Sequence, residues 1–213
     1  KIEDAKLAGI SVCFSENISY YIPINHISVD GSKKIEGQLE EKYVINQISK
    51  ICQNKSILKI GQNIKYDIRI LNKYGVIFNS IADTMLISYS IDNGIYKHNL
   101  DDLSFNHLNH NTIKYKDVVG TGKNEITFDK VKMDDAVNYA AEDSLLTYRL
   151  FQNLYPRLIK ERANFVYNNI DLPLVEVLSK IEENGIKVNK KFLTSLSKEF
   201  EDESKKLEKK IYK

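Results

Sequence analysis

The sequence lacks most of the features that mark a zinc protein, a disulfide-stabilised protein or a membrane protein. Its 213 residues include two cysteines, Cys13 and Cys52, which form no CxxC pair. Their isolation argues against a zinc site or a disulfide framework and favours a reducing compartment. There is no run of eighteen apolar residues and no leader of basic, apolar and small residues. We therefore expect neither a membrane span nor secretion, but a cytoplasmic protein.

The sequence also lacks an excess of charge of either sign. Its 31 basic and 29 acidic side chains leave a net charge of +2, so any contact with nucleic acid has to come from a local surface rather than from a bulk field. A hydrophobic content of 42% over this length is enough for one core and part of a second. Because the sequence opens at Lys1 without a methionine, we expect a piece of a longer chain.

Short apolar runs dominate the first part of the chain. LAGISVCF (7–14) and ISYYIPI (18–24) are rich in β-branched and aromatic residues and predict a β-hairpin. Helical spacing over 39–51 predicts a helix that leads to a strand at SILKIG (56–61). A further strand is predicted at GVIF (75–78).

Helical patterns dominate from residue 83 onward and extend to about 160. The segment 111–130 interrupts them, and its two glycines and several lysines without periodicity predict a mostly exposed loop. Asp171 is predicted to cap a helix that ends at Gly185, and a last helix begins near Lys190. Strands followed by helices predict an α/β or α+β layer architecture with a mixed sheet.

Two acids lie four residues behind hydrogen-bonding side chains. Asn63 precedes Asp67, and Tyr139 precedes Asp143; on a helix each pair shares a face. Two carboxylates from separate elements suit a divalent metal, and paired metals can clamp both oxygens of a phosphodiester hydrolysis. Spacing alone is also typical of a solvated helix surface at Asp143 and of a helix cap at Asn63.

Both pairs belong to segments that resemble a known family. GQNIKYD (61–67) resembles the second motif, and YAAED (139–143) the third, of the 3'-5' proofreading exonuclease domain in family A DNA polymerases, the bacterial DNA polymerase I type. Four further segments are similar in the same order: DTMLISY (83–89), HNLDDLS (98–104), GKNEITF (122–128) and LPLVEVLSKIEENGIKVN (172–189).

The resemblance implies an α/β fold of the RNase H-like, DEDD-type exonuclease kind, with a mixed five-stranded sheet flanked by helices. C-terminal helices would then lead into a polymerase thumb, which divides the chain into an exonuclease domain over 1–165 and the start of a polymerase domain over 166–213. The implied partners are the single-stranded 3' end of DNA and the remainder of a polymerase chain. The implied setting is a monomer in the bacterial cytoplasm.

The resemblance also assigns roles to single residues. Asp67 and Asp143 match metal ligands, and Tyr139 matches the tyrosine that orients the attacking water. Two divalent ions, Mg²⁺ or Mn²⁺, are expected in the complete domain. The positions that match those holding the DNA 3' end are Gln62, Asn63 and Tyr66, whose amides and phenol suit sugar, phosphate or base contacts. A half-buried core phenol is the alternative interpretation of Tyr66.

One motif of the family is missing. The first motif, Asp-x-Glu, lies in a strand that would precede Lys1, and the adjacent acids Glu3 and Asp4 do not have its spacing. We therefore expect the first strand and half of the metal ligands to be absent, with impaired metal binding and hydrolysis. Asp83 is expected to be a structural helix cap. No metal-ligand spacing is found among the four histidines, which are His26, His98, His107 and His110.

Two alternative functions stay open. An inactive scaffold of this fold could brace a polymerase domain, but it would have no physical need for Asp67, Tyr139 and Asp143 together. An RNA exonuclease of the RNase D type would share the fold and the YxxxD spacing. The polymerase-like segment after Leu172 argues against it, and a preference for RNA ends would support it.

Overall fold

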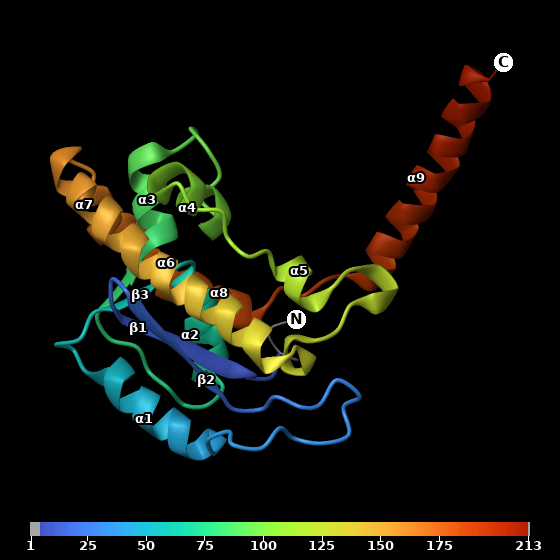
Figure 1. Cartoon of the computed structure of the whole chain (residues 1–213). Helices are drawn as coiled ribbons and strands as arrows, with labels where there is room; N and C mark the ends of the chain where they lie inside the picture. The colour runs from blue at the N-terminus through green and yellow to red at the C-terminus, as the bar shows by residue number, and fades with distance from the viewer. Residues whose placement is uncertain (1–4, 213) are drawn as a thin grey trace. The chain divides into compact units, whose positions relative to one another are not determined.

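The computed structural model describes residues 5–212 (Figure 1). The chain forms two compact units, Lys1–Val177 and Leu178–Lys213. Glu3 and Asp4 lie outside the described residues. Between residues 5 and 212, none of the helices combines the length and apolar character that a membrane crossing requires. The predicted division between residues 165 and 166 stays a prediction.

Strands alternate with helices in the first half of the first unit, and helices follow. The strands are β1 (Gly9–Ser15), β2 (Ile18–Pro23), β3 (Lys59–Gly61) and β4 (Ile81–Asp83). The α-helices of this unit are α1 (Glu41–Gln53), α2 (Ile64–Asn72), α3 (Thr84–Asp92), α4 (Leu100–Leu108), α5 (Tyr115–Val119), α6 (Met133–Lys160) and α7 (Asn164–Val166). Helix α8 (Leu172–Asn184) begins in the first unit and ends in the second, which also contains α9 (Lys190–Ile211).

The predicted hairpin is confirmed. Strands β1 and β2 pair antiparallel from Gly9 opposite Pro23, with a register shift between Cys13 and Ser15. Ile10 of β1 packs against the hydrophobic core that includes residues of α1. The opposite face of the hairpin packs against α6. The helices α1 and α6 therefore cover opposite faces of this ribbon (Figure 1).

A second, parallel pair joins β3 to β4, from Lys59 opposite Ile81 to Gly61 opposite Asp83. The predicted strand at 75–78 is wrong, since that segment is irregular. Its apolar residues are explained by burial rather than by a sheet: Val76 is fully buried, and its N–H bonds to the last turn of α2. The sheet partner of β3 begins only at residue 81.

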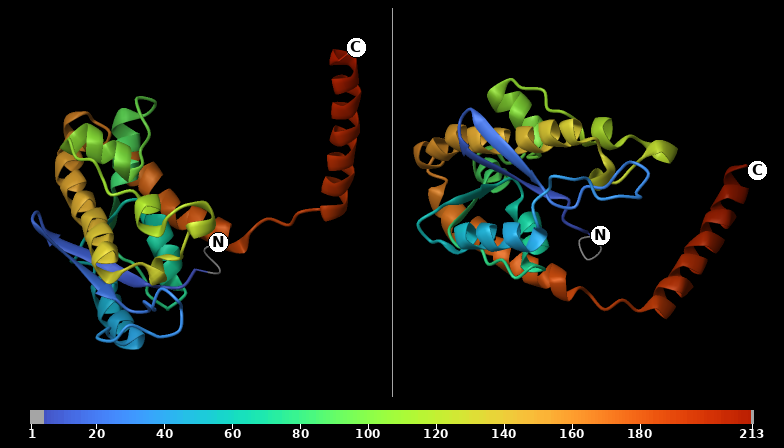
Figure 2. Two further views of the ribbon diagram at one scale, coloured as in Figure 1. Left: turned by 45° about the vertical axis from the view of Figure 1, so that its right-hand side comes forward. Right: turned by 60° about the horizontal axis from the view of Figure 1, so that its bottom comes forward.

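Helix α6 is the element shared by both strand pairs. It packs against β1, β2 and β3, and Figure 2 shows it running across the hairpin. The two pairs contain both strand orientations of the predicted mixed sheet, but within residues 5–212 they are not hydrogen-bonded to each other. The α/β fold with flanking helices is confirmed, and its described sheet is smaller than the five strands implied.

Two local predictions need correction. The segment 111–130 is not a plain loop, because it forms α5 and two short 3-10 turns, Gly122–Asn124 and Phe128–Lys130. Val119 and Val131 are buried there with Ala136 of α6, which gives the segment a small core of its own. Asp171 does not begin a helix as a cap, since it lies in a π-helical turn, Tyr167–Asp171, and its carboxylate accepts a hydrogen bond from Ser90.

Candidate active site

The second motif occupies the turn between β3 and α2. Gly61 ends the strand, and a Cβ on it would lie 2.7 Å from the Cβ of Ile64, so only glycine lets the helix start this close to the strand. Asn63 then reverses the chain in the left-handed conformation, with φ 57°, which asparagine tolerates better than most residues. The turn delivers Asp67 one helical turn into α2.

The buried carboxylate of Asp83 caps the N-termini of two helices, α2 and α3. Asp83 accepts hydrogen bonds from the N–H groups of Asn63 (3.0 Å), Ile64 (2.9 Å) and Met85 (2.9 Å). The prediction that Asp83 is a structural cap is confirmed for α3, and the same side chain also caps α2. The prediction that the Asn63 side chain caps α2 is wrong, since it makes no capping hydrogen bond. Asp83, which is distant in the sequence, supplies that cap instead.

Asp67 titrates in an unusual range. Part of its side chain stays exposed, yet the surrounding protein desolvates the carboxylate and, with the nearby charge of Asp83, raises the pKa of Asp67 to about 7. A cation placed beside this carboxyl would favour its ionised form.

The third motif lies on α6. The buried Ala136 and Ala140 fix the inner face of this helix, and Tyr139 and Asp143 share another face. The Tyr139 hydroxyl favours the ionised form of the Asp143 carboxyl. Desolvation still dominates and raises the pKa of Asp143 to about 7. Desolvation and the Asp143 charge raise the pKa of the Tyr139 phenol, so it stays protonated and able to donate.

The three residues predicted to hold DNA differ in how much of their side chain is available. Gln62 is used internally, because its Nε2 donates to the carbonyl of His98 (2.8 Å) and its Oε1 accepts from Thr84 (2.6 Å). The side chain of Asn63 makes no hydrogen bond that caps the helix. Tyr66 is 49% exposed and lines an open groove, so the interpretation of Tyr66 as a core phenol is wrong.

That groove has a volume of about 1180 Å³ within the first unit. Aromatic rings, two lysines and two carboxylates line it, and they come from Tyr66, Tyr74, Tyr115, Phe128, Lys6, Lys34, Glu41 and Asp129. Aromatic faces offer stacking surfaces for the bases of single-stranded nucleic acid. The groove therefore offers a surface for an extended strand directly beside the second motif.

Tyr115 joins the two motifs, although the sequence does not predict it as a site residue. Its ring stacks on Phe128 at 6.3 Å between centroids and meets Tyr139 edge-on at 5.9 Å. It also lines the same groove as Tyr66 of the second motif. The sequence signal is weak, because Tyr115 opens a five-residue helix in a segment without periodicity.

The carboxylates have different neighbours. Asp83 acts on Asp67, whereas Glu142 and Asp101 act on Asp143. Carboxylate oxygens are the donors that Mg²⁺ and Mn²⁺ prefer, so the chemistry of both residues fits a divalent cation. Within residues 5–212 no cluster of three or more potential ligand side chains occurs. The four histidines instead pair with protein groups, which are Tyr21, Ser88, Tyr96 and Glu142.

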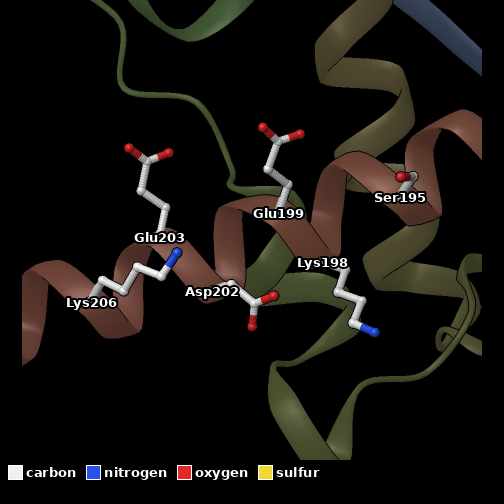
Figure 3. A pocket seen from close by; sticks show the side chains of 6 residues that line it. All are labelled: Ser195, Lys198, Glu199, Asp202, Glu203 and Lys206. Carbon is white, nitrogen blue, oxygen red and sulfur yellow. The ribbon is translucent and has the colours of Figure 1, made fainter.

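A second hollow, of about 460 Å³, lies along α9 and is lined by that helix (Figure 3). Its carboxylates and amines fan out from one helix rather than pointing at a common centre. All of its lining side chains belong to residues 195–206. This surface is therefore a solvated helix face rather than a site.

Comparison with known proteins gives consistent results. A family model described as 3'-5' exonuclease matches residues 1–159. DNA polymerase I of Rhizobium leguminosarum is 37% identical over 221 residues, covering 98% of this chain and 22% of the relative. The chain therefore spans about a fifth of the length of this relative.

Solved structures share the fold at low identity. The POL domain of Pol1 from M. smegmatis, in complex with DNA primer-template and dNTP, gives a TM-score of 0.60 at 18% identity and covers 86% of this chain and 28% of that chain. Brucella melitensis NrnC gives a TM-score of 0.53 at 17% identity and covers 83% of both chains. These likenesses support the fold alone.

Proposed function

This chain belongs to the 3'-5' exonuclease family of family A DNA polymerases, and from that membership we propose that it is the proofreading part of a DNA polymerase I. In this proposal the parent protein removes mismatched nucleotides from the single-stranded 3' end of DNA by hydrolysis. The observation that carries the proposal is the pairing of Tyr139 and Asp143, which influence each other's pKa, beside an aromatic groove that Tyr115 lines.

The proposed roles follow from the contacts. Asp67 and Asp143 would hold divalent metal ions, which when bound supply a Lewis acid for the scissile phosphate and activate water. The protonated Tyr139 hydroxyl, oriented by Asp143, would position the attacking water.

The strand end would lie against the aromatic groove. Tyr66 and Tyr115 would stack against its bases. Asn63 would bond to its sugar or phosphate. Gln62 would support the turn that presents Asn63, because both ends of its amide are already hydrogen-bonded within the protein.

We further propose that the missing ligands come from an additional strand preceding residue 1. The two strand pairs of the structure pack on the same helix, α6, without bonding to each other across the described residues. A strand placed between them would complete a mixed sheet and satisfy an edge that would otherwise carry unpaired backbone groups. Such a strand would bring the first motif's carboxylates to the two already in place.

An excision assay tests this function. The substrates are end-labelled single-stranded DNA and RNA with the same sequence, in the presence of Mg²⁺ or Mn²⁺. The proteins are this chain, a form extended upstream through the proposed strand, and the extended form carrying Asp143→Asn. We expect release of 3' nucleotides from DNA by the extended form only, and about a hundredfold loss or more in the variant.

Other outcomes would favour other functions. Faster excision from RNA would support an RNase D-type enzyme. No release by the extended form would support a scaffold that braces the polymerase, and it would contradict the proposed function.

A further inference from the structure

The connection between α4 and α5 is fastened to α6 by one carboxylate. Both oxygens of Glu142 are used: Oε1 lies 2.8 Å from His110 Nε2, and Oε2 accepts the backbone N–H of Ile113 at 2.7 Å. The Glu142 side chain is 17% exposed and that of His110 is 40% exposed, so these bonds are partly open to solvent, and what sets them apart is geometry: one carboxylate holds two residues of the connection.

A second carboxylate holds the same connection from α4. Asp101 accepts a hydrogen bond from Thr112, which is buried, and pairs with Lys114 at 2.8 Å. The Asp101 and Lys114 side chains are 47% and 42% exposed, so this ion pair is screened and contributes little. Glu142 therefore ties the connection to α6, and Asp101 ties it to α4.

The anchored connection ends where Tyr115 begins α5. The ring of Tyr115 lies 5.9 Å from that of Tyr139 and lines the groove together with Tyr66. Glu142 directly precedes Asp143, but successive residues on a helix point about 100° apart. Asp143 can therefore face Tyr139 while Glu142 faces the connection.

We propose that Glu142 is a positioning residue that fixes the place of Tyr115 in the groove by clamping residues 110–113 onto α6. This inference rests on the proposed function. Glu142 touches neither the DNA nor the reacting phosphate, and it acts through the segment that carries Tyr115. Its loss would weaken the grip on the strand end more than the chemical step.

Two substitutions separate geometry from charge. In Glu142→Gln the amide oxygen can still accept from Ile113 N–H, and the amide nitrogen can donate to a neutral His110. In Glu142→Ala both bonds are lost. The matched control is Glu161→Ala, which removes a carboxylate that is also ion-paired, with Arg157 at 2.7 Å, and that directly follows the same helix.

The experiment uses the whole parent protein and three readouts. Fluorescence anisotropy gives the Kd for a fluorescein-labelled single-stranded oligodeoxynucleotide in EDTA, where no hydrolysis occurs. Steady-state excision kinetics in Mg²⁺ give KM and kcat. Mass spectrometry follows amide exchange at Ile113 and Tyr115, and circular dichroism checks that each variant folds.

We expect Glu142→Ala to raise Kd and KM about tenfold, the order expected from losing one base-stacking contact, with kcat nearly unchanged and faster exchange at Ile113. Glu142→Gln and Glu161→Ala should stay close to the unmutated protein. Tyr115→Ala should match Glu142→Ala, and the double variant should be no worse than Tyr115→Ala alone.

The positioning role is contradicted if Glu142→Ala leaves Kd and KM unchanged, if the loss falls on kcat alone, or if the two substitutions are additive. If Glu142→Ala does not fold, His110→Ala removes one of the two bonds and should shift Kd in the same direction by less. An unmutated protein that binds DNA in EDTA but never releases a nucleotide would instead contradict the proposed function, and the Kd and exchange comparisons would still decide the role of Glu142.

Discussion

The two motifs present the same sequence pattern, a polar residue followed by an aspartate four positions later, but the structure supports them in different ways. The position of Asp67 depends on Asp83, because this buried residue caps the helix that carries Asp67. Asp143 lies one helical turn from Tyr139, and the ring of Tyr139 contacts Tyr115 of the segment that Glu142 binds. The comparison teaches that one motif depends on the backbone of a turn, whereas the other depends on side chains of a neighbouring segment.

The largest effect is expected at the two aspartates that are proposed to bind metal, because both motifs would contribute to the same reaction. Asp67→Asn and Asp143→Asn should each slow excision by the whole parent protein about a hundredfold or more, because each removes a carboxylate that would hold metal. Single-turnover rates on labelled single-stranded DNA provide the measurement. A large loss in one variant and none in the other would show that the two sites are not equivalent.

The next substitution should affect the second motif and leave the third unchanged. Asp83→Ala leaves three N–H groups without their partner, so it should lower the free energy of unfolding by about 3 kcal/mol. Hydrogen exchange should rise at 63–67 and stay unchanged at 139–143. Equal increases in both segments would mean that Asp83 supports the whole unit rather than the second motif.

Two substitutions of Asn63 distinguish the contribution of its backbone conformation from that of its side chain, and their effect on stability should be smaller. Asn63→Ala places alanine at φ 57° and should cost about 1 kcal/mol of stability, whereas Asn63→Gly should cost almost none. Both variants lose the amide, so both should bind single-stranded DNA equally weakly. Chemical denaturation and fluorescence anisotropy measure the two quantities. Unaltered DNA binding by Asn63→Gly would remove Asn63 from the proposed DNA contacts.

The last prediction concerns pH. The pKa of Asp143 is raised to about 7 in the folded state, above its unfolded value of about 3.9. Folding therefore favours the protonated form, and this contribution to stability is fully present below about pH 4 and is lost as pH rises through about 7. In EDTA, Asp143→Asn should gain stability relative to the unmutated protein between about pH 5 and pH 8. Urea midpoints at both values test the sign, and a constant difference would contradict it.

Much of this architecture is predictable from the sequence, for reasons that individual residues make clear. The hairpin at 7–24 and the helices from Thr84 onward have strong local patterns, and the structure confirms them. Residues 75–78 mislead because Val76 is apolar for burial at a helix end, and a sequence pattern does not distinguish that from a strand. Asn63 misleads because its cap comes from Asp83, twenty residues away, and such long-range caps leave no local signal.

The site shows the same limit. Asp67, Tyr139 and Asp143 are predicted as site residues by the family resemblance, and their role stays a prediction. Tyr115 is not, because it lies in a segment without periodicity and its role follows from contacts made across the fold. The sequence presents Glu142 only as one letter of the third motif, and its two bonds depend on how the connection from α4 returns to α6.

The central claim is that this chain carries the working carboxylates of a proofreading site that is separate from nucleotide addition. The most direct test compares the whole parent protein with its Asp143→Ala variant, measuring mismatch excision and nucleotide addition on one labelled primer-template. We predict that the variant loses excision about a hundredfold or more while addition stays nearly unchanged. Equal loss of both activities, or excision that survives the substitution, would contradict the claim.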